Sequence, residues 1–123
     1  MKKLMLGLAA AALALAPAAP ALAAGKSATV SFAVPGADEA TSTKATYACG
    51  DQTVAVEYIN AGSVSLALLT LKDDFVVAAN VLSGSGARYA GAQYIWWSKG
   101  MSEATLTDLM TDTQTPVACT AKK

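Results

Sequence analysis

The chain has 123 residues, with nine basic residues, nine acidic residues, two cysteines and no histidine. The length suits a single domain once a leader is removed. A Ser-His-Asp triad is excluded without histidine, and the lack of a basic stripe argues against nucleic-acid binding.

The first 23 residues have the pattern of a secretory signal peptide. Lys2 and Lys3 precede an apolar run from Leu4 to Leu15, and Ala21-Leu22-Ala23 gives a small-x-small cleavage pattern. We expect cleavage after Ala23, which leaves seven basic and nine acidic residues and a net charge of −2. No cysteine lies near the end of this segment, so a lipobox is absent. We therefore expect no membrane anchor and a mature protein that is free in an exported compartment.

The two cysteines are Cys49 and Cys119. An even number of cysteines in an exported chain predicts a disulfide, here closing a loop of about 70 residues. On the chain-entropy account such a link contributes roughly 4 kcal/mol. The alternative is two separate buried thiols. Two distant cysteines without histidine do not make a metal site, so we expect no metal.

Short alternating segments dominate the mature chain and predict an all-β fold. Val54, Val56 and Tyr58 share one face of a strand, as do Ala45, Tyr47 and Cys49. A third set, Val64, Leu66 and Leu68, also shares one face and predicts another half-buried strand. The expected strands cover residues 28–34, 43–49, 53–58, 63–68, 75–82, 93–99, 102–107 and 116–120.

Turn residues separate these segments. Asn60-Ala61-Gly62-Ser63 predicts a hairpin turn, and Gly100 predicts another between residues 93–99 and 102–107. Ser83-Gly84-Ser85-Gly86 marks a further break. Seven or eight short strands at this spacing predict a small antiparallel barrel or sandwich.

Two stretches near the C-terminus, SGARY at residues 85–89 and WWSKG at 96–100, each join a glycine to one polar group. Ser85 and Lys99 are thereby expected at loop tips. The ordinary interpretation is a flexible connector and a solvated charge. A Ser-Lys catalytic pair is disfavoured, because neither Ser-x-x-Lys nor Gly-x-Ser-x-Gly surrounds Ser85. We therefore do not expect an enzyme.

Trp96 and Trp97 are adjacent, so in a strand they point to opposite faces. One is expected in the core. The other either shields a barrel rim, stacks on a sugar or anchors an interface. The sequence does not say which of the two faces outward.

Several of these segments together, in order and spacing, resemble the periplasmic and membrane-bound inhibitors of C-type lysozyme of Gram-negative bacteria. The resemblance runs from Thr46 to Thr120. The residues that carry it are Tyr47-Ala48-Cys49, Val54 to Asn60, Ser85 to Tyr89, Trp97 to Gly100, Glu103 to Leu106, and Cys119.

The resemblance implies an eight-stranded antiparallel β-barrel with one disulfide, over residues 44–123, after a segment 24–43 of unassigned course. It implies a periplasmic, cofactor-free protein that competitively inhibits C-type lysozyme, and the missing lipobox indicates the soluble branch. Ser85 and Lys99 are expected to reach the two catalytic carboxylates of lysozyme, and Arg88 and Tyr89 to shape the first loop. The full expected lysozyme-binding set is Ser85, Gly86, Arg88, Tyr89, Ser98, Lys99 and Gly100.

Two other functions remain open on the sequence. A module that binds cell-wall glycan would use an exposed Trp96 or Trp97 as a stacking surface. A structural envelope protein would have no soluble ligand.

Overall fold

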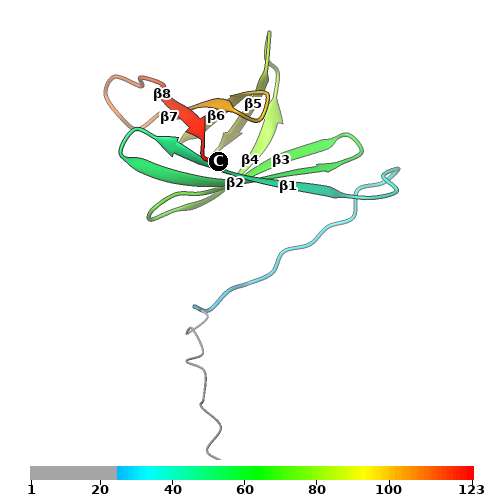
Figure 1. Cartoon of the computed structure of the whole chain (residues 1–123). Helices are drawn as coiled ribbons and strands as arrows, with labels where there is room; N and C mark the ends of the chain where they lie inside the picture. Colours follow the sequence, from blue (N-terminus) through cyan, green and yellow to red (C-terminus); the bar gives the residue numbers. More distant parts are fainter. Residues whose placement is uncertain (1–24) are drawn as a thin grey trace, which may run out of the picture. The chain divides into compact units, whose positions relative to one another are not determined.

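The computed structural model describes residues 25–123 (Figure 1). The chain divides into two units, Met1–Ser31 and Phe32–Lys123, and the second contains every strand found in residues 25–123. The signal peptide and its cleavage site after Ala23 lie outside the described residues. Within residues 25–123, no helix has the length and hydropathy needed to cross a membrane.

Eight antiparallel strands, each hydrogen-bonded to its neighbours in sequence, close into a barrel when the first pairs with the last. This confirms the expected all-β, eight-stranded barrel. Adjacent strands are joined by short connections, except for a longer loop before the last strand. The strands are β1 (Thr41–Cys49), β2 (Gln52–Ala61), β3 (Val64–Thr70), β4 (Phe75–Val81), β5 (Ala87–Gly91), β6 (Tyr94–Lys99), β7 (Glu103–Asp108) and β8 (Val117–Ala121).

One expected strand is absent and one unexpected strand is present. Residues 28–34 form no strand, and nearly all of their side chains are exposed. Because β1 already pairs with β2 on one side and β8 on the other, the closed barrel has no free edge for a further strand. The eighth strand is instead β5, which takes in the second half of the SGARY stretch.

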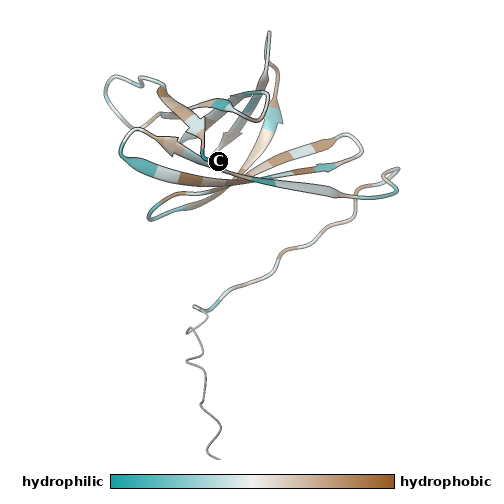
Figure 2. Cartoon of the chain, in the orientation of Figure 1, coloured by the Kyte–Doolittle hydropathy of each residue, from teal (hydrophilic) through white to brown (hydrophobic). Residues whose placement is uncertain are grey.

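The inward faces of β1 and β2 are those expected, but the face of β3 is reversed. Val64, Leu66 and Leu68 do share one face, yet it is the outer one, and Ala67 and Leu69 are the fully buried residues of β3. The register explains this result, because Ala67 lies opposite the inward Tyr58. The small methyl group of Ala67 leaves room for the tyrosine ring. Figure 2 shows hydrophobic and hydrophilic residues interspersed along the strands.

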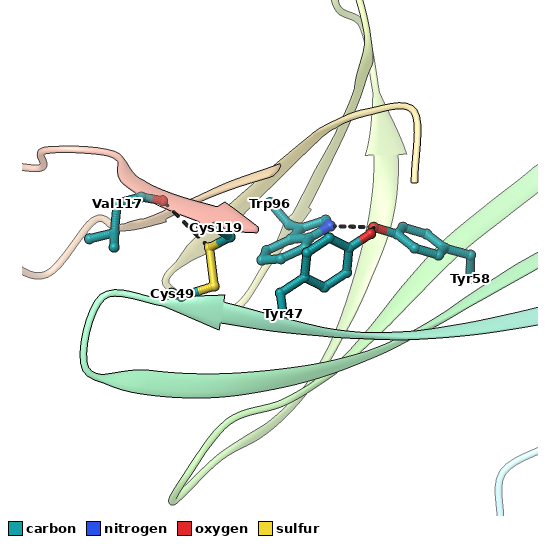
Figure 3. Close-up of a disulfide and its surroundings, with 6 residues drawn as sticks. All are labelled: Tyr47, Cys49, Tyr58, Trp96, Val117 and Cys119. Atoms are coloured by element: carbon teal, nitrogen blue, oxygen red, sulfur yellow. Dashed lines mark hydrogen bonds between the residues drawn. A yellow bond between two sulfur atoms is a disulfide. The ribbon is translucent and has the colours of Figure 1, made fainter. Parts of the chain in front are cut away.

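Aromatic side chains fill the centre of the barrel. The Trp96 indole meets the Tyr47 ring edge-on, with 5.0 Å between the ring centroids, and both residues are 0 % exposed. The Trp96 Nε1–H donates a 2.9 Å hydrogen bond to the Tyr58 hydroxyl (Figure 3). Trp96 is therefore the core tryptophan, and every buried side-chain N and O atom described has a partner.

The disulfide between Cys49 and Cys119 is present and joins β1 to β8 (Figure 3). The two residues are direct register partners with a Cα–Cα distance of 4.2 Å. Only three register pairs make up the β1–β8 pairing, against nine between β1 and β2. The disulfide therefore reinforces one of the two shortest strand pairings of the barrel, and the alternative of two separate thiols is wrong.

Candidate functional site

The two polar residues singled out in the sequence lie at the same end of the barrel, Ser85 in the β4–β5 connection and Lys99 at the last position of β6. In an up-and-down barrel, alternate connections leave from the same end, so the β4–β5 connection and the β6–β7 turn emerge together. Between them run the paired strands β5 and β6, with Ala87 opposite Ser98 at their base. Figure 1 shows the β4–β5 connection as a narrow projection at the top of the view.

Ser85 sits in the β4–β5 connection with its backbone held firmly. Its carbonyl oxygen accepts a 2.9 Å hydrogen bond from the Trp97 indole N–H and a 2.6 Å bond from the Ser83 hydroxyl. The Ser85 residue is otherwise exposed. The peptide is thus anchored through its carbonyl, while the side-chain hydroxyl is available to a partner.

Gly86 lets this connection lie flat against β6. Its φ of +64° falls in the left-handed region, where a Cβ atom is unfavourable. A Cβ at Gly86 would also come within 2.7 Å of the Ser98 carbonyl oxygen and 2.8 Å of the Trp97 ring. The close approach of Gly86 to β6 therefore couples the Ser85 loop to the strand that ends in Lys99.

We expect Gly86→Ala to lower the free energy of unfolding by about 1–2 kcal/mol from the left-handed backbone alone, with the close contacts adding to this loss. Gly84→Ala is the matched control, because a Cβ at Gly84 meets nothing within 4 Å. Chemical denaturation should show Gly84→Ala within about 0.5 kcal/mol of wild type. Equal stabilities for the two variants would contradict the close packing of Gly86 on β6.

Lys99 is the last residue of β6 and is exposed at the β6–β7 turn. Gly100, directly after it, has a φ of +64°, as a tight turn requires. The carbonyl of Ser102 accepts a 2.9 Å hydrogen bond from the Ala121 amide, which ties the far side of the turn to the end of β8. The exposed Lys99 side chain therefore extends from a backbone that is hydrogen-bonded on both sides of the turn, within β6 and at Ser102.

The expected binding set separates into exposed and buried residues. Tyr89 and Ser98 are 7 % and 5 % exposed and face the barrel interior. Arg88 and Tyr89 lie in strand β5, directly after the β4–β5 connection that they were expected to shape. The exposed members of the expected set are Ser85, Gly86, Arg88, Lys99 and Gly100.

Trp97 lies on the outer face of β6, opposite Arg88 of β5, and is only partly buried. It is the outward tryptophan, and its indole N–H is already bonded to the Ser85 carbonyl. No sequence pattern indicates this bond, because its partners are 12 residues apart and the acceptor is a backbone atom.

Leu82, which sequence analysis placed at the end of a strand, is a further feature of this end of the barrel. It is 95 % exposed and precedes the serine- and glycine-rich connection. An open hollow of about 600 Å³ lies beside it, lined by residues that include Ser65, Asn80 and Tyr89. Leu82 therefore adds an exposed apolar side chain to the end of the barrel that carries Ser85 and Lys99. In the described part of the chain, no cluster of three or more His, Cys, Asp or Glu residues could hold a metal.

Comparison with known proteins gives a family. Residues 47–115 match the family described as "MliC: Membrane-bound lysozyme-inhibitor of c-type lysozyme". The membrane-bound lysozyme inhibitor of C-type lysozyme from Pseudomonas aeruginosa is 43% identical over 77 residues, which cover 61% of this chain and 60% of that protein. The protein of the same name from Cupriavidus necator is 45% identical over 65 residues, covering 52% of this chain and 51% of that protein.

A solved structure agrees with these sequence matches. The crystal structure of Pseudomonas aeruginosa MliC in complex with hen egg white lysozyme is similar over 79% of this chain and 100% of that chain, with 38% identity and a TM-score of 0.64. The aligned part of this chain thus spans about 60% and 51% of the two curated relatives. The chain belongs to the MliC family of membrane-bound inhibitors of C-type lysozyme.

Proposed function

We propose that this protein inhibits C-type lysozyme by inserting the β4–β5 connection and the β6–β7 turn into the active-site cleft. One observation carries the mechanism: Ser85 and Lys99 are exposed at the same end of the barrel, and the Ser85 carbonyl is bonded to Trp97 of β6, the strand that ends at Lys99. The family match and the neighbouring structure, whose MliC chain is in complex with hen egg white lysozyme, support the choice of partner.

The chemistry of the two exposed groups suits the target. A lysozyme cleft holds two carboxyl groups, one protonated as general acid and one ionised, about 5–5.5 Å apart in a retaining enzyme. The Lys99 ammonium can pair with the ionised carboxylate, and the Ser85 hydroxyl can donate to or accept from the other. Exclusion of water from the filled cleft would strengthen both contacts.

Fixed loops also reduce the entropy lost on binding. The Ser85 carbonyl has two donors and Gly86 packs against β6, so this connection loses less freedom in a complex than a mobile loop would. Arg88 and Leu82 are exposed beside it. We assign them to the rim of the contact, where an arginine and an apolar side chain commonly add affinity.

The glycan-binding alternative has weaker support. Trp96 is buried, and Trp97 is partly buried with its N–H bonded to Ser85. Neither tryptophan offers a fully exposed ring on which a sugar could stack. An inhibitor function is also consistent with the family, whose description is that of an inhibitor and not of an enzyme.

The experiment that tests the function is a lysis assay with C-type lysozyme and purified mature protein. An inhibitor slows lysis in proportion to its concentration and does not bind peptidoglycan fragments. A glycan-binding module binds the fragments and leaves the purified enzyme's turnover of a small soluble substrate unchanged. A structural protein does neither, and either of the last two results would contradict the proposal.

We further propose a periplasmic location with the mature protein in soluble form. The basis is the signal-peptide pattern of residues 1–23, without a cysteine near its end. Fractionation of the native host checks this directly. Release by osmotic shock would support the soluble form, whereas retention in the membrane pellet would support the anchored form that the family description names.

A further inference from the structure

The β6–β7 turn is also held from inside the barrel. The Tyr47 hydroxyl donates a 3.1 Å hydrogen bond to the carbonyl oxygen of Met101, two residues after Lys99. Tyr47 belongs to β1, lies 54 positions earlier in the chain and is completely buried. A core side chain therefore contacts the backbone of the exposed turn that carries the Lys99 ammonium.

The proton order in this network is fixed by the chemistry of its two ends. The Trp96 indole N–H can only donate, and it donates to the Tyr58 hydroxyl at 2.9 Å. The Met101 carbonyl can only accept, so the single hydroxyl proton of Tyr47 points to it. The Tyr58 hydroxyl must then donate to the Tyr47 oxygen across their 2.9 Å separation.

Burial keeps the Tyr47 hydroxyl protonated, and therefore able to donate, over a wide pH range. The pKa of Tyr47 is raised above its ordinary value, first by burial and then by the hydrogen bond with Tyr58. A raised pKa means that the hydroxyl stays protonated at neutral and moderately alkaline pH. Ring packing alone would be satisfied by phenylalanine at position 47, so the hydroxyl contributes the contact with the turn.

We propose that Tyr47 is a positioning residue for the lysozyme contact. Its hydroxyl holds the Met101 carbonyl, so that Lys99 and Gly100 keep one conformation. This inference rests on the proposed function. Tyr47 would act only through the turn and would not itself touch lysozyme, because its side chain is enclosed in the barrel.

The two tyrosines of the network provide a matched pair of variants. Tyr47→Phe and Tyr58→Phe each keep the ring and remove one buried hydroxyl. Only Tyr47→Phe removes a bond to the turn, whereas Tyr58→Phe leaves the Trp96 N–H without its acceptor and should destabilise the barrel at least as much. Both variants are therefore expected to lose stability, but only Tyr47→Phe is expected to lose inhibition.

The test combines an inhibition assay against C-type lysozyme with NMR order parameters for the amides of Gly100, Met101 and Ser102. We expect Tyr47→Phe to raise the inhibition constant about 3- to 10-fold, the loss typical of one neutral hydrogen bond, and to lower the three order parameters. Tyr58→Phe should leave the inhibition constant within about twofold of wild type and the order parameters unchanged.

Equal effects of both variants on inhibition, or unchanged order in Tyr47→Phe, would overturn this inference alone. A wild-type protein without effect on lysozyme would instead overturn the proposed function, and this inference with it. If Tyr47→Phe does not fold, an NMR measurement on the wild-type protein still tests the inference. The Tyr47 hydroxyl proton should exchange slowly with water and show an NOE to Met101. Fast exchange or the absence of this NOE would contradict the proposal.

Discussion

Lys99→Ala is expected to weaken inhibition of C-type lysozyme by about 2–5 kcal/mol, roughly 30-fold to several thousand-fold in the inhibition constant. The exposed ammonium group would become buried against an ionised carboxylate in the complex, and truncation would leave that carboxylate without its partner. The measurement is a titration of inhibitory activity with the variant and with wild type.

Lys72→Ala is the matched control for this variant. Lys72 is exposed like Lys99 but lies in the β3–β4 connection, which leaves from the opposite end of the barrel. The Lys72→Ala substitution removes the same charge as Lys99→Ala. Its inhibitory potency should stay within about twofold of wild type, since distant surface charges contribute mainly weak steering. Wild-type potency in Lys99→Ala, or an equal loss in Lys72→Ala, would show that Lys99 is not the anchor.

Removal of the disulfide between Cys49 and Cys119 is expected to lower the free energy of unfolding by about 4 kcal/mol, because the link spans 70 positions. It also secures a β1–β8 pairing of only three residue pairs. Denaturant titrations of a Cys49→Ala/Cys119→Ala double variant and of wild type, each with and without reductant, measure the loss.

Reductant should shift the wild-type transition and leave that of the double variant unchanged. A difference of less than about 1 kcal/mol between oxidised and reduced wild type would mean that strand pairing alone closes the barrel. The Ala121 amide at the end of β8 also donates a hydrogen bond to the Ser102 carbonyl, so reduction should loosen the Lys99 turn as well. The reduced protein is therefore expected to be the weaker inhibitor.

Much of the fold was predictable from local sequence, because its strands are short and alternate regularly. The period of two placed Tyr47, Val54 and Val56 in the core correctly. Local periodicity failed at β3, where both faces carry leucines and only the cross-strand register with Tyr58 decides which face is buried. It failed again at residues 28–34, where strand formation depends on a free edge that a closed barrel does not provide.

The candidate site was predictable in its exposed residues but not in what supports them. Gly86 and Gly100 were recognisable as turn residues, and Ser85 and Lys99 as their polar neighbours. The bonds that hold these connections join distant side chains to backbone carbonyls, as in Trp97 to Ser85. A carbonyl acceptor is present at every residue, so the sequence carries no pattern that would point to a particular one.

A double-mutant cycle across the complex is the most direct test of the central claim, that Lys99 reaches a catalytic carboxylate of lysozyme. Calorimetry would measure the affinities of wild type and Lys99→Ala for C-type lysozyme and for a lysozyme whose ionised catalytic aspartate is replaced by asparagine. Direct pairing predicts a coupling energy of about 1.5 kcal/mol or more between the two substitutions. Effects that add within about 0.5 kcal/mol would contradict the claim, because independent sites are additive to that degree.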